Sequence, residues 1–454
     1  MSELWSKVSA YIEANVERAI AELTELCRQP SVAAQGLGMA ECAGLVKDLL
    51  ERRGIKAELM PTRGYPVVFG SARGRTNKTL IFYNHYDVQP PEPLELWESP
   101  PFEPQVRDGK FYARGAADDK GHIICRLFAL DAVLAACGEL PCNIKFVIEG
   151  EEEIGSPNLE DFVKANAQTL AGDACIWEFG GVNFEGRPEI YLGMRGICYV
   201  ELKVRTARVD AHSGLGGSIF PNAAWRLVWA LSTLKDPDER IKIAGFYDAA
   251  KPPTRRDLEL LARLPDESEQ IKQTYGLKGF VRGLSGLELR RAAVFEPTCT
   301  ICGLSSGYQG PGTKTVLPAE AMAKVDFRLV PEQDPFDIFE KLKAHLTAHG
   351  FDDVEVSLLS AEHPARVDPD DPFVQLTVEA AREVYGKEPA VHPLIGGSGP
   401  MYPFVKYLRV PVGVAGVGYP GNRAHAPNEH IRLEDFILGT KHTARVLLGF
   451  SGLL

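Results

Sequence analysis

Short apolar runs alternate with amphipathic stretches along the first 180 residues of the chain. Residues 79–84, 142–148 and 173–179 are mostly apolar runs typical of buried strands. Residues 123–136 and 159–170 have the length and spacing of helices. An earlier amphipathic helix is predicted to begin near Ser2, because apolar residues recur at helical spacing at Trp5, Val8, Ile12, Val16 and Ile20. This alternation predicts an α/β fold with a mostly parallel sheet.

The middle of the chain has a different pattern. Residues 197–206 alternate like a half-exposed strand, and residues 221–234 have the pattern of a helix. A charged stretch at about 236–293 is expected to be helical. Three further elements follow it, namely a strand at 323–330, a helix at 335–350 and a strand at 354–359. This order predicts a small α+β domain of ferredoxin-like type.

The α/β character returns from about residue 364. Residues 372–385 have a helical pattern, and residues 410–417 (VPVGVAGV) resemble a strand. We therefore predict that the second domain is inserted into the first, so that 1–195 and 364–454 form one domain and 196–363 form the other. A chain of 454 residues is long enough for two such domains.

Polar side chains follow the predicted strands of the first domain. His85 and Asp87 follow the first strand, EGEEE at 149–153 follows the second, and Glu178 lies at the end of the third. Sites in open α/β sheets form beyond the carboxyl ends of the strands. Two loops add to this set: GAADDKG, which carries Asp118 before a helix, and GNRAHAPNE, which carries His425.

Each of these features has an ordinary structural explanation when taken alone. His85 with Asp87 can be a surface histidine beside a capping acid, Asp118 can belong to a helix cap, and the glutamates can be a solvated charge run. Together, two histidines and several carboxylates form a nitrogen and oxygen ligand set suited to zinc, manganese or cobalt. A carboxylate bridging two ions about 3.5–4 Å apart would complete a hydrolytic two-metal site.

Composition and charge narrow the functional classes. The net charge of −11 argues against a nucleic-acid partner, and no apolar run is long enough to span a membrane. The nine cysteines are scattered and odd in number, which indicates thiols in a reducing compartment. The N-terminus lacks the apolar segment and cleavage site of a signal peptide. We therefore expect a cytoplasmic protein.

The motifs, in their order along nearly the whole chain, resemble one enzyme family. These motifs are NHYDVQP, FYARGAADDKG, EGEEEIGS, MRGICYVEL, AHSGLGGS, GPGTKTVLPA, FRLVP and GGSGP. The chain resembles the dinuclear-zinc metallopeptidase family of aminoacylase, carnosinase-like dipeptidases, glutamate carboxypeptidase and succinyl-diaminopimelate desuccinylase. It is most similar to the cytosolic carnosinase-like dipeptidases within that family. The resemblance implies a metal-binding catalytic domain and an inserted lid and dimerisation domain.

The resemblance also implies a role for individual residues. Two metal ions, zinc first and manganese or cobalt as alternatives, would be bound by His85, Asp118, Glu153, Glu178 and His425. Asp118 would bridge the ions, with a cis peptide bond after it, and Asp87 would orient His85. Glu152 would act as general base, leaving Glu149 as a strand-end acid and Glu151 as an outer or solvated one. The oxyanion would be stabilised by His212 of a partner subunit in a homodimer, and the substrate carboxylate would be held by Arg328, Gly397 and Ser398.

Glu178 leaves the substrate class open. Carnosinase-like dipeptidases usually have Asp at this position, whereas Glu in the wider family accompanies carboxypeptidase or deacylase activity. The predicted function is hydrolysis of an amide bond in dipeptides or small peptides with a free carboxylate. The alternative at the same site is an N-acyl-amino-acid deacylase or carboxypeptidase. A non-catalytic binding protein on this fold would lack a ligand or the base, and neither is missing from this sequence.

Overall fold

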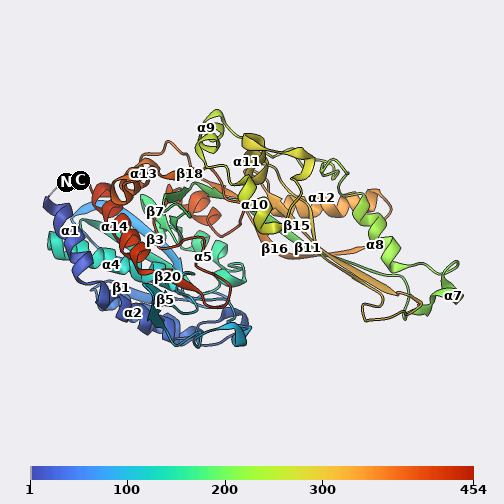
Figure 1. Ribbon diagram of the computed structural model, residues 1–454, viewed down its shortest axis with the longest axis horizontal. Coiled ribbons are helices and arrows are strands. Elements are labelled where there is room, and N and C mark those ends of the chain that lie inside the picture. Colours follow the sequence, from blue (N-terminus) through green and yellow to red (C-terminus); the bar gives the residue numbers. More distant parts are fainter. Residues whose placement is uncertain (1–2) are drawn as a thin grey trace. The chain divides into compact units, whose positions relative to one another are not determined.

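The computed structural model describes residues 3–454, so the predicted helix start at Ser2 lies outside the described residues. The chain divides into two compact units. The first comprises residues 1–192, 366–393 and 400–454, and the second comprises residues 193–365 and 394–399 (Figure 1). Segment 394–399, which carries Gly397 and Ser398, thus groups with the second unit, although the sequence assigned all of 364–454 to the first domain. Its backbone explains this, because Ile395 N–H donates to the carbonyl of Gly193 and Arg195 N–H to that of Gly397.

A six-stranded sheet forms the centre of the first unit. Its order is β1 (Lys56–Met60), β2 (Val67–Ala72), β6 (Cys142–Glu149), β3 (Thr76–His85), β7 (Ala174–Trp177) and β19 (Val412–Val414). The neighbours β6–β3, β3–β7 and β7–β19 are parallel, and only the β1–β2–β6 edge is antiparallel. The mostly parallel α/β sheet predicted from the sequence is therefore confirmed.

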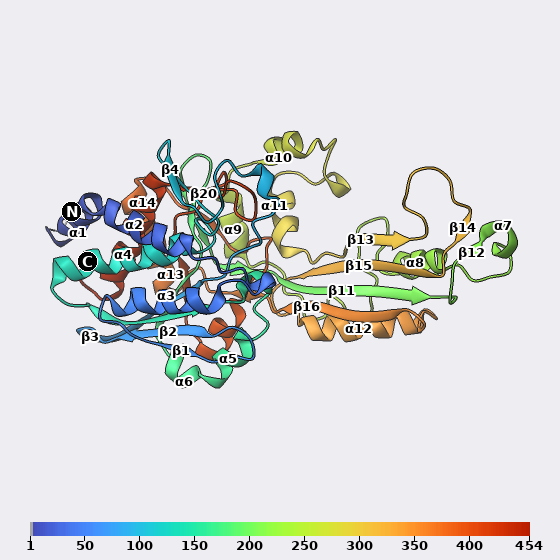
Figure 2. The same ribbon diagram turned by 90° about the horizontal axis from the view of Figure 1, so that it is seen from below.

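Helices cover both faces of this sheet. On one face α4 (Lys120–Cys137) packs on β3, and three helices pack on α4, namely α1 (Glu3–Ala14), α2 (Val16–Arg28) and α14 (Leu433–Phe450). Figure 2 shows α5 (Leu159–Ala165) and α6 (Ala167–Leu170) on the other side of the sheet from α3 (Met39–Glu51) and α4. The helix α13 (Pro372–Tyr385), with the bounds that its pattern predicts, contacts β19 and α14.

Two predicted helices of the first unit are each broken at an asparagine. The N-terminal helix divides at Asn15 into α1 and α2, and the helix predicted at 159–170 divides at Asn166 into α5 and α6. The side-chain amide of Asn15 donates to the carbonyl of Tyr11 at 2.8 Å, and that of Asn166 donates to the carbonyl of Phe162 at 2.9 Å. Such local bonds compete with the helical backbone, which an apolar periodicity alone does not reveal.

The second unit contains a four-stranded antiparallel sheet. Its order is β13 (Thr300–Ser306), β15 (Glu320–Leu329), β11 (Gly196–Arg205) and β16 (Glu355–Glu362). The helices α8 (Ala223–Ser232) and α12 (Pro335–Ala348) pack on β11, and their apolar residues share a core with Val325 and Phe327. Because side chains alternate along a strand, Asp326 and Arg328 face away from these helices. The chain order β11, α8, β13, β15, α12, β16 is ferredoxin-like, as predicted.

The charged stretch at 236–293 is not the continuous helical region that the sequence suggested. Residues 236–254 form turns, and three short helices follow, α9 (Arg255–Arg263), α10 (Ser268–Tyr275) and α11 (Gly286–Phe295). Pro237, Pro252 and Pro253 lack the backbone N–H that a helix interior needs. The carboxylate of Asp236 also accepts the N–H groups of Asp238 and Arg240, which closes a turn.

In the part of the chain that is described, residues 3–454, no helix is both long and apolar enough to cross a membrane.

Candidate active site

The parallel strands of the first unit bring polar residues to one edge of the sheet. His85 ends β3, Glu149 ends β6, and Glu178 directly follows β7. A separate antiparallel pair, β5 (Lys110–Tyr112) with β20 (His430–Arg432), holds the segments that carry Asp118 and His425 side by side. The sequence-predicted metal ligands of this unit therefore come from segments that the fold brings together.

Asp87 connects His85 to the glutamate turn. The Nδ1 atom of His85 lies 3.1 Å from the carbonyl oxygen of Asp87 and 3.3 Å from its Oδ1. The two carboxylate oxygens of Asp87 accept the backbone N–H groups of Glu152 and Glu153 at 3.2 and 3.0 Å. Because Asp87 is fully buried, it can fix both the histidine ring and the turn that carries two of the predicted site residues.

The carboxylate of Asp118 lies between two histidines. Its Oδ1 is 3.0 Å from Nε2 of His85, and its Oδ2 is 3.0 Å from Nε2 of His425. The peptide bond between Asp118 and Asp119 is cis, as the resemblance predicts. One carboxylate thus faces the nitrogen atoms of both histidines, which is the arrangement that a bridging ligand requires.

Glu153 completes one side of this arrangement. Its Oε2 lies 3.1 Å from Nε2 of His425 and accepts a hydrogen bond from the amide of Gln89 at 2.8 Å. Asp118, Glu153 and His425 each present one ligand atom, and these three atoms lie within 4.8 Å of one another. They are the three residues that the resemblance assigns to the second metal.

Glu178 interacts electrostatically with Glu152, and both interact with His85, in surroundings unfavourable to their negative charge. Burial raises the pKa of Glu178 well above its ordinary value, and the charge of Glu152 raises it further. Burial likewise raises the pKa of Glu152, with further increases from Asp118 and Glu153 and an opposing effect of His85. Carboxyls with such raised pKa values in one cluster are typical of functional sites.

The pKa values of the two histidines are also raised, in their case by the nearby carboxylates. Burial lowers the pKa of His85, but its hydrogen bonds to Asp118 and Asp87 outweigh this effect and leave the pKa well above 6.5. The hydrogen bonds to Asp118 and Glu153 raise the pKa of His425 to about 10. The carboxylates around these histidines therefore favour a positive charge, and few protein groups at this point supply one.

The residues present fit divalent metal ions. Within residues 3–454, the buried oxygens Oε1 of Glu153 and Oε2 of Glu178 have no hydrogen-bond donor. An unpartnered buried carboxylate oxygen is costly unless a cation or donor satisfies it. Imidazole nitrogen and carboxylate oxygen are common ligand atoms of zinc, manganese and cobalt.

Several supporting residues were not identified from the sequence. The fully buried carboxylate of Glu429 accepts from Arg114 at 2.6 Å and from the backbone N–H groups of Gly115, Ala117 and Asp118 at 2.8–3.0 Å. It thereby holds the turn that presents the Asp118 carboxylate. The spacing of Glu429 four residues after His425 was visible in the sequence, but its pairing with Arg114 depends on a contact 315 residues apart.

Glu149 and Glu151 are both bound by protein groups. Glu149 accepts from the hydroxyl groups of Tyr83 and Ser156 at 2.6 and 2.8 Å, and burial raises its pKa to about 8. Glu151 is 6% exposed and accepts from the amide of Asn158 at 2.8 Å, so a solvated role for it is wrong. The two acids thus hold neighbouring residues in place.

The predicted carboxylate-binding residues of the second unit lie next to each other. Arg328 donates from Nη1 to Oγ of Ser398 at 2.8 Å, and its Nε lies 3.3 Å from Asp326. The carbonyl of Gly397 accepts the backbone N–H of Arg195 at 2.9 Å. The guanidinium of Arg328 and the Ser398 hydroxyl therefore converge on one point of the second unit.

His212 lies at an exposed position of the second unit. It belongs to a short strand, β12 (Ala211–His212), paired with β14 (Val316–Leu317). Its Nδ1 accepts from the backbone N–H of Gly214 at 2.9 Å, and its Nε2 lies 3.5 Å from the hydroxyl of Thr315. The accepted bond at Nδ1 leaves Nε2 as the position for a proton that could be donated to another group.

Comparison with known proteins identifies the family of this chain. The sequence of residues 81–449 matches the model of peptidase family M20/M25/M40. This range includes all five predicted metal ligands. The chain belongs to this family. It is thus an enzyme of a metallopeptidase family, and the family resemblance seen in the sequence is confirmed.

Three relatives illustrate the range within the M20 family. A solved M20 family metallo-carboxypeptidase from Sulfolobus solfataricus is 39% identical, with a TM-score of 0.91 over 96% of this chain and 99% of that one. Human carnosine dipeptidase 1 is 27% identical, with a TM-score of 0.80 over 99% of this chain and all of the other. The Cys-Gly metallodipeptidase of Schizosaccharomyces pombe is 29% identical over 83% of this chain and 81% of its own.

Proposed function

We propose that the protein is a cytoplasmic dinuclear metallopeptidase that hydrolyses dipeptides and other short peptides with a free C-terminal carboxylate. The observation that supports it most is the Asp118 carboxylate placed 3.0 Å from both His85 and His425. Asp118 would bridge two divalent ions, zinc first and manganese or cobalt as alternatives. Glu178 and His85 would complete one ion's ligands, and Glu153 and His425 those of the other.

The residues of the first unit would divide the chemistry between them. Two bound divalent ions would lower the pKa of a water and polarise the scissile carbonyl. The carboxylate of Glu152 would accept the proton of the attacking water and later deliver it to the leaving amine. Asp87 would hold His85 and, through the backbone of Glu152, the position of the base.

The second unit would supply the substrate contacts. Arg328 suits bidentate binding of a carboxylate, with the hydroxyl of Ser398 and the backbone at Gly397 beside it. His212 would donate to the oxyanion that develops on the scissile carbonyl. In this proposal each His212 serves the site of a partner subunit.

Exposed apolar side chains support a homodimer formed through the second unit. On α8, Trp225 and Trp229 are 57% and 53% exposed, and on β13 Ile301 and Leu304 are 52% and 57% exposed. Within the described chain β13 pairs only with β15, so its other edge is open. An open edge beside an apolar helix face favours pairing with an identical edge, which a twofold axis makes self-complementary. Light scattering that finds a fully active monomer would contradict this.

A carboxypeptidase acting on longer peptides is the second candidate. Two observations favour it: a glutamate at position 178, and the 39% identity to the Sulfolobus metallo-carboxypeptidase. Dipeptides, N-acetyl amino acids and N-blocked tripeptides should be assayed with zinc, manganese and cobalt. Turnover of free dipeptides above the blocked substrates supports the first proposal. A preference for blocked tripeptides supports the carboxypeptidase. A preference for N-acetyl amino acids supports a deacylase.

A further inference from the structure

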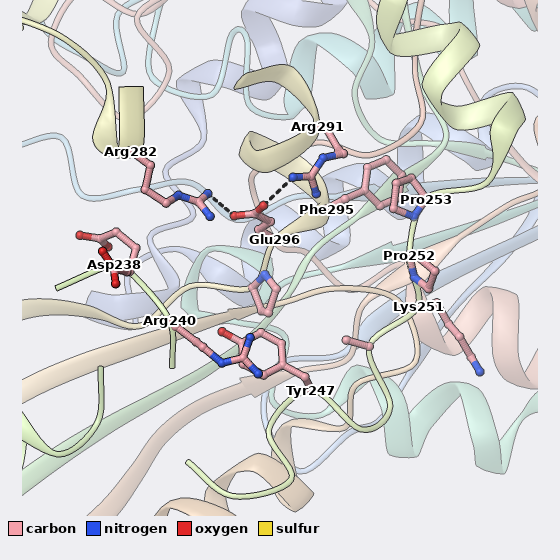
Figure 3. Close-up of a pocket in the computed structure, with 13 residues that line it drawn as sticks. Asp238, Arg240, Tyr247, Lys251, Pro252, Pro253, Arg282, Arg291, Phe295 and Glu296 are labelled. Carbon is pink, nitrogen blue, oxygen red and sulfur yellow. Dashed lines mark hydrogen bonds and ion pairs between the residues drawn. The ribbon is translucent and has the colours of Figure 1, made fainter. Parts of the chain in front are cut away.

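A cavity of about 360 Å³ opens in the second unit, apart from Arg328 and His212. Its walls come from the loop between α8 and α9, from η4 (Val281–Gly283), and from the end of α11 with the residues after it (Figure 3). Ligand pockets have volumes of about 300–1,000 Å³, so this cavity suits a small molecule. Rings supply much of its apolar surface, namely those of Tyr247, Pro252, Pro253, Phe295 and Pro297.

Two guanidinium groups in the wall share a single acid. Arg282 and Arg291 donate to different oxygens of Glu296, the latter at 2.8 Å, as the dashed lines of Figure 3 show. Both carboxylate oxygens of Glu296 are therefore engaged, and Arg291 also pairs with Glu288 at 2.9 Å, so these four side chains carry no net charge. The cation that an anionic ligand could meet must therefore come from another residue of the cavity lining.

Arg240 adds a cation that protein groups leave unneutralised. Its guanidinium lies over the ring of Tyr247, 5.3 Å from the ring centroid, and across residues 3–454 its side chain forms no hydrogen bond or ion pair. The neighbouring Glu239 is already bound to Lys235 at 2.6 Å. A guanidinium stacked on an aromatic ring has a fixed plane and free N–H groups at its edge, which is the geometry that a carboxylate requires.

Asp238 gives the same cavity a carboxylate without a partner. Its backbone N–H takes part in the turn closed by Asp236, but within the described chain its side chain has no donor. An unpaired cation and an unpaired anion in the lining of one cavity match the charges of a zwitterion. Free α-amino acids and very short peptides have this combination of ammonium group, carboxylate and side chain.

The wall of the cavity is hydrogen-bonded to the strand that carries Arg328. The carbonyl of Glu296 accepts from Nη2 of Arg195 at 2.8 Å, and the same nitrogen donates to the carbonyl of Arg328 at 3.3 Å. Thr298, two residues after Glu296, exchanges two further bonds with the backbone of Arg328. A displacement of Glu296 would therefore shift the backbone of Arg328.

We propose that this cavity is a regulatory site for a free amino acid or very short peptide. Arg240 binds its carboxylate, Asp238 its ammonium group, and the rings of Tyr247 and Pro297 its side chain. Because Glu296 and Arg195 connect the cavity to Arg328, occupation changes the affinity for substrate. This consequence rests on the proposed role of Arg328, whereas the binding itself does not.

Calorimetric titration of the metal-loaded enzyme with L-leucine and with leucinamide tests the binding. We expect L-leucine to bind and leucinamide, which lacks the carboxylate, to bind at least tenfold more weakly. Arg240→Gln should weaken L-leucine binding about tenfold, since it removes the charge-assisted contact. Arg255→Gln is the matched control, because Arg255 is exposed on α9 and does not line the cavity. Unchanged binding in Arg240→Gln would overturn the proposal.

Two further measurements separate this site from the catalytic one. Arg328→Gln should leave an Arg240-dependent binding event in the titration, and loss of all L-leucine binding in that variant would show that the amino acid binds only at Arg328. In kinetic assays, L-leucine should alter the KM for a dipeptide in the wild type but not in Arg240→Gln, whose activity without L-leucine stays unchanged. The titration does not depend on turnover, so a failed peptidase assay and a failed binding assay are distinguishable.

Discussion

The candidate site residues of the two units are held in contrasting ways. In the first unit, His85, Asp118 and Glu153 each contact another predicted site residue, and buried partners such as Asp87 and Glu429 fix their segments. In the second unit, His212 is exposed, and the contacts of its imidazole among the described residues are the backbone N–H of Gly214 and the hydroxyl of Thr315. The first arrangement is complete within one chain, whereas the second presents a free imidazole face. This contrast supports the proposal that the first unit holds the metal ligands and the base in place, and that His212 serves a group outside its own unit.

Removing the proposed base should have the largest effect. Glu152→Gln keeps the size of the side chain but cannot accept the proton, so kcat should fall about 10³-fold. Metal content, measured by mass spectrometry, should stay at two ions. Glu151→Gln is the matched control, because Glu151 is bound to Asn158 and should lose less than about threefold. Equal losses of kcat in the two variants would contradict the assignment of the base to Glu152 and not to Glu151.

Replacing the exposed histidine should have the second largest effect. His212→Ala should lower kcat about 10²-fold, as for the loss of one oxyanion donor, without loss of metal. Co-expressed His212→Ala and Glu152→Gln subunits should recover about a quarter of wild-type activity, because half of the dimers then contain one intact site. Activity no greater than that of the two single variants would show that His212 serves its own chain.

Changing a partner of the preorganised cluster should have a smaller effect. Asp87→Asn places an amide where a carboxylate accepts two backbone N–H groups, so the turn at Glu152 and Glu153 should shift. Metal affinity, measured by competition with a chelator, should fall about 10–100-fold. An unaltered metal affinity would mean that the metal site does not depend on the buried carboxylate of Asp87.

The smallest expected effect concerns a buried acid of the second unit. Burial raises the pKa of Glu362 from 4.5 to about 7, although the charge of Arg328 opposes this. The folded state thus holds a proton that the unfolded chain has lost, so Glu362 reduces stability as the pH rises from 4.5 through 7. Glu362→Gln should raise the Tm relative to wild type at pH 8, with a smaller difference at pH 5. The same Tm difference at both pH values would contradict this assignment.

The sequence predicted well those features that depend on local pattern. The apolar runs located β3, β6 and β7, so the polar residues at their ends pointed to the sheet edge where His85 and Glu178 lie. The helix at 372–385 was found with its bounds because Pro372 begins it and Gly386 ends it. The grouping of Arg328 with Ser398 followed from the family resemblance.

Features that depend on distant contacts could not be predicted in this way. The bracing of Asp118 by Glu429 and Arg114 arises only when β5 and β20 pair. The breaks at Asn15 and Asn166 depend on side-chain bonds that compete with the helical backbone. The cavity beside Arg240 depends on how a turn-rich segment folds back, which a charge pattern does not encode.

The most direct test of the central claim is the location of metal in the first unit. Anomalous diffraction from crystals of the protein loaded with zinc or manganese should show two peaks about 3.5–4 Å apart. The carboxylate of Asp118 should bridge them, with His85 and Glu178 at one peak and Glu153 and His425 at the other. A single peak, or two peaks that Asp118 does not join, would contradict the proposed dinuclear site.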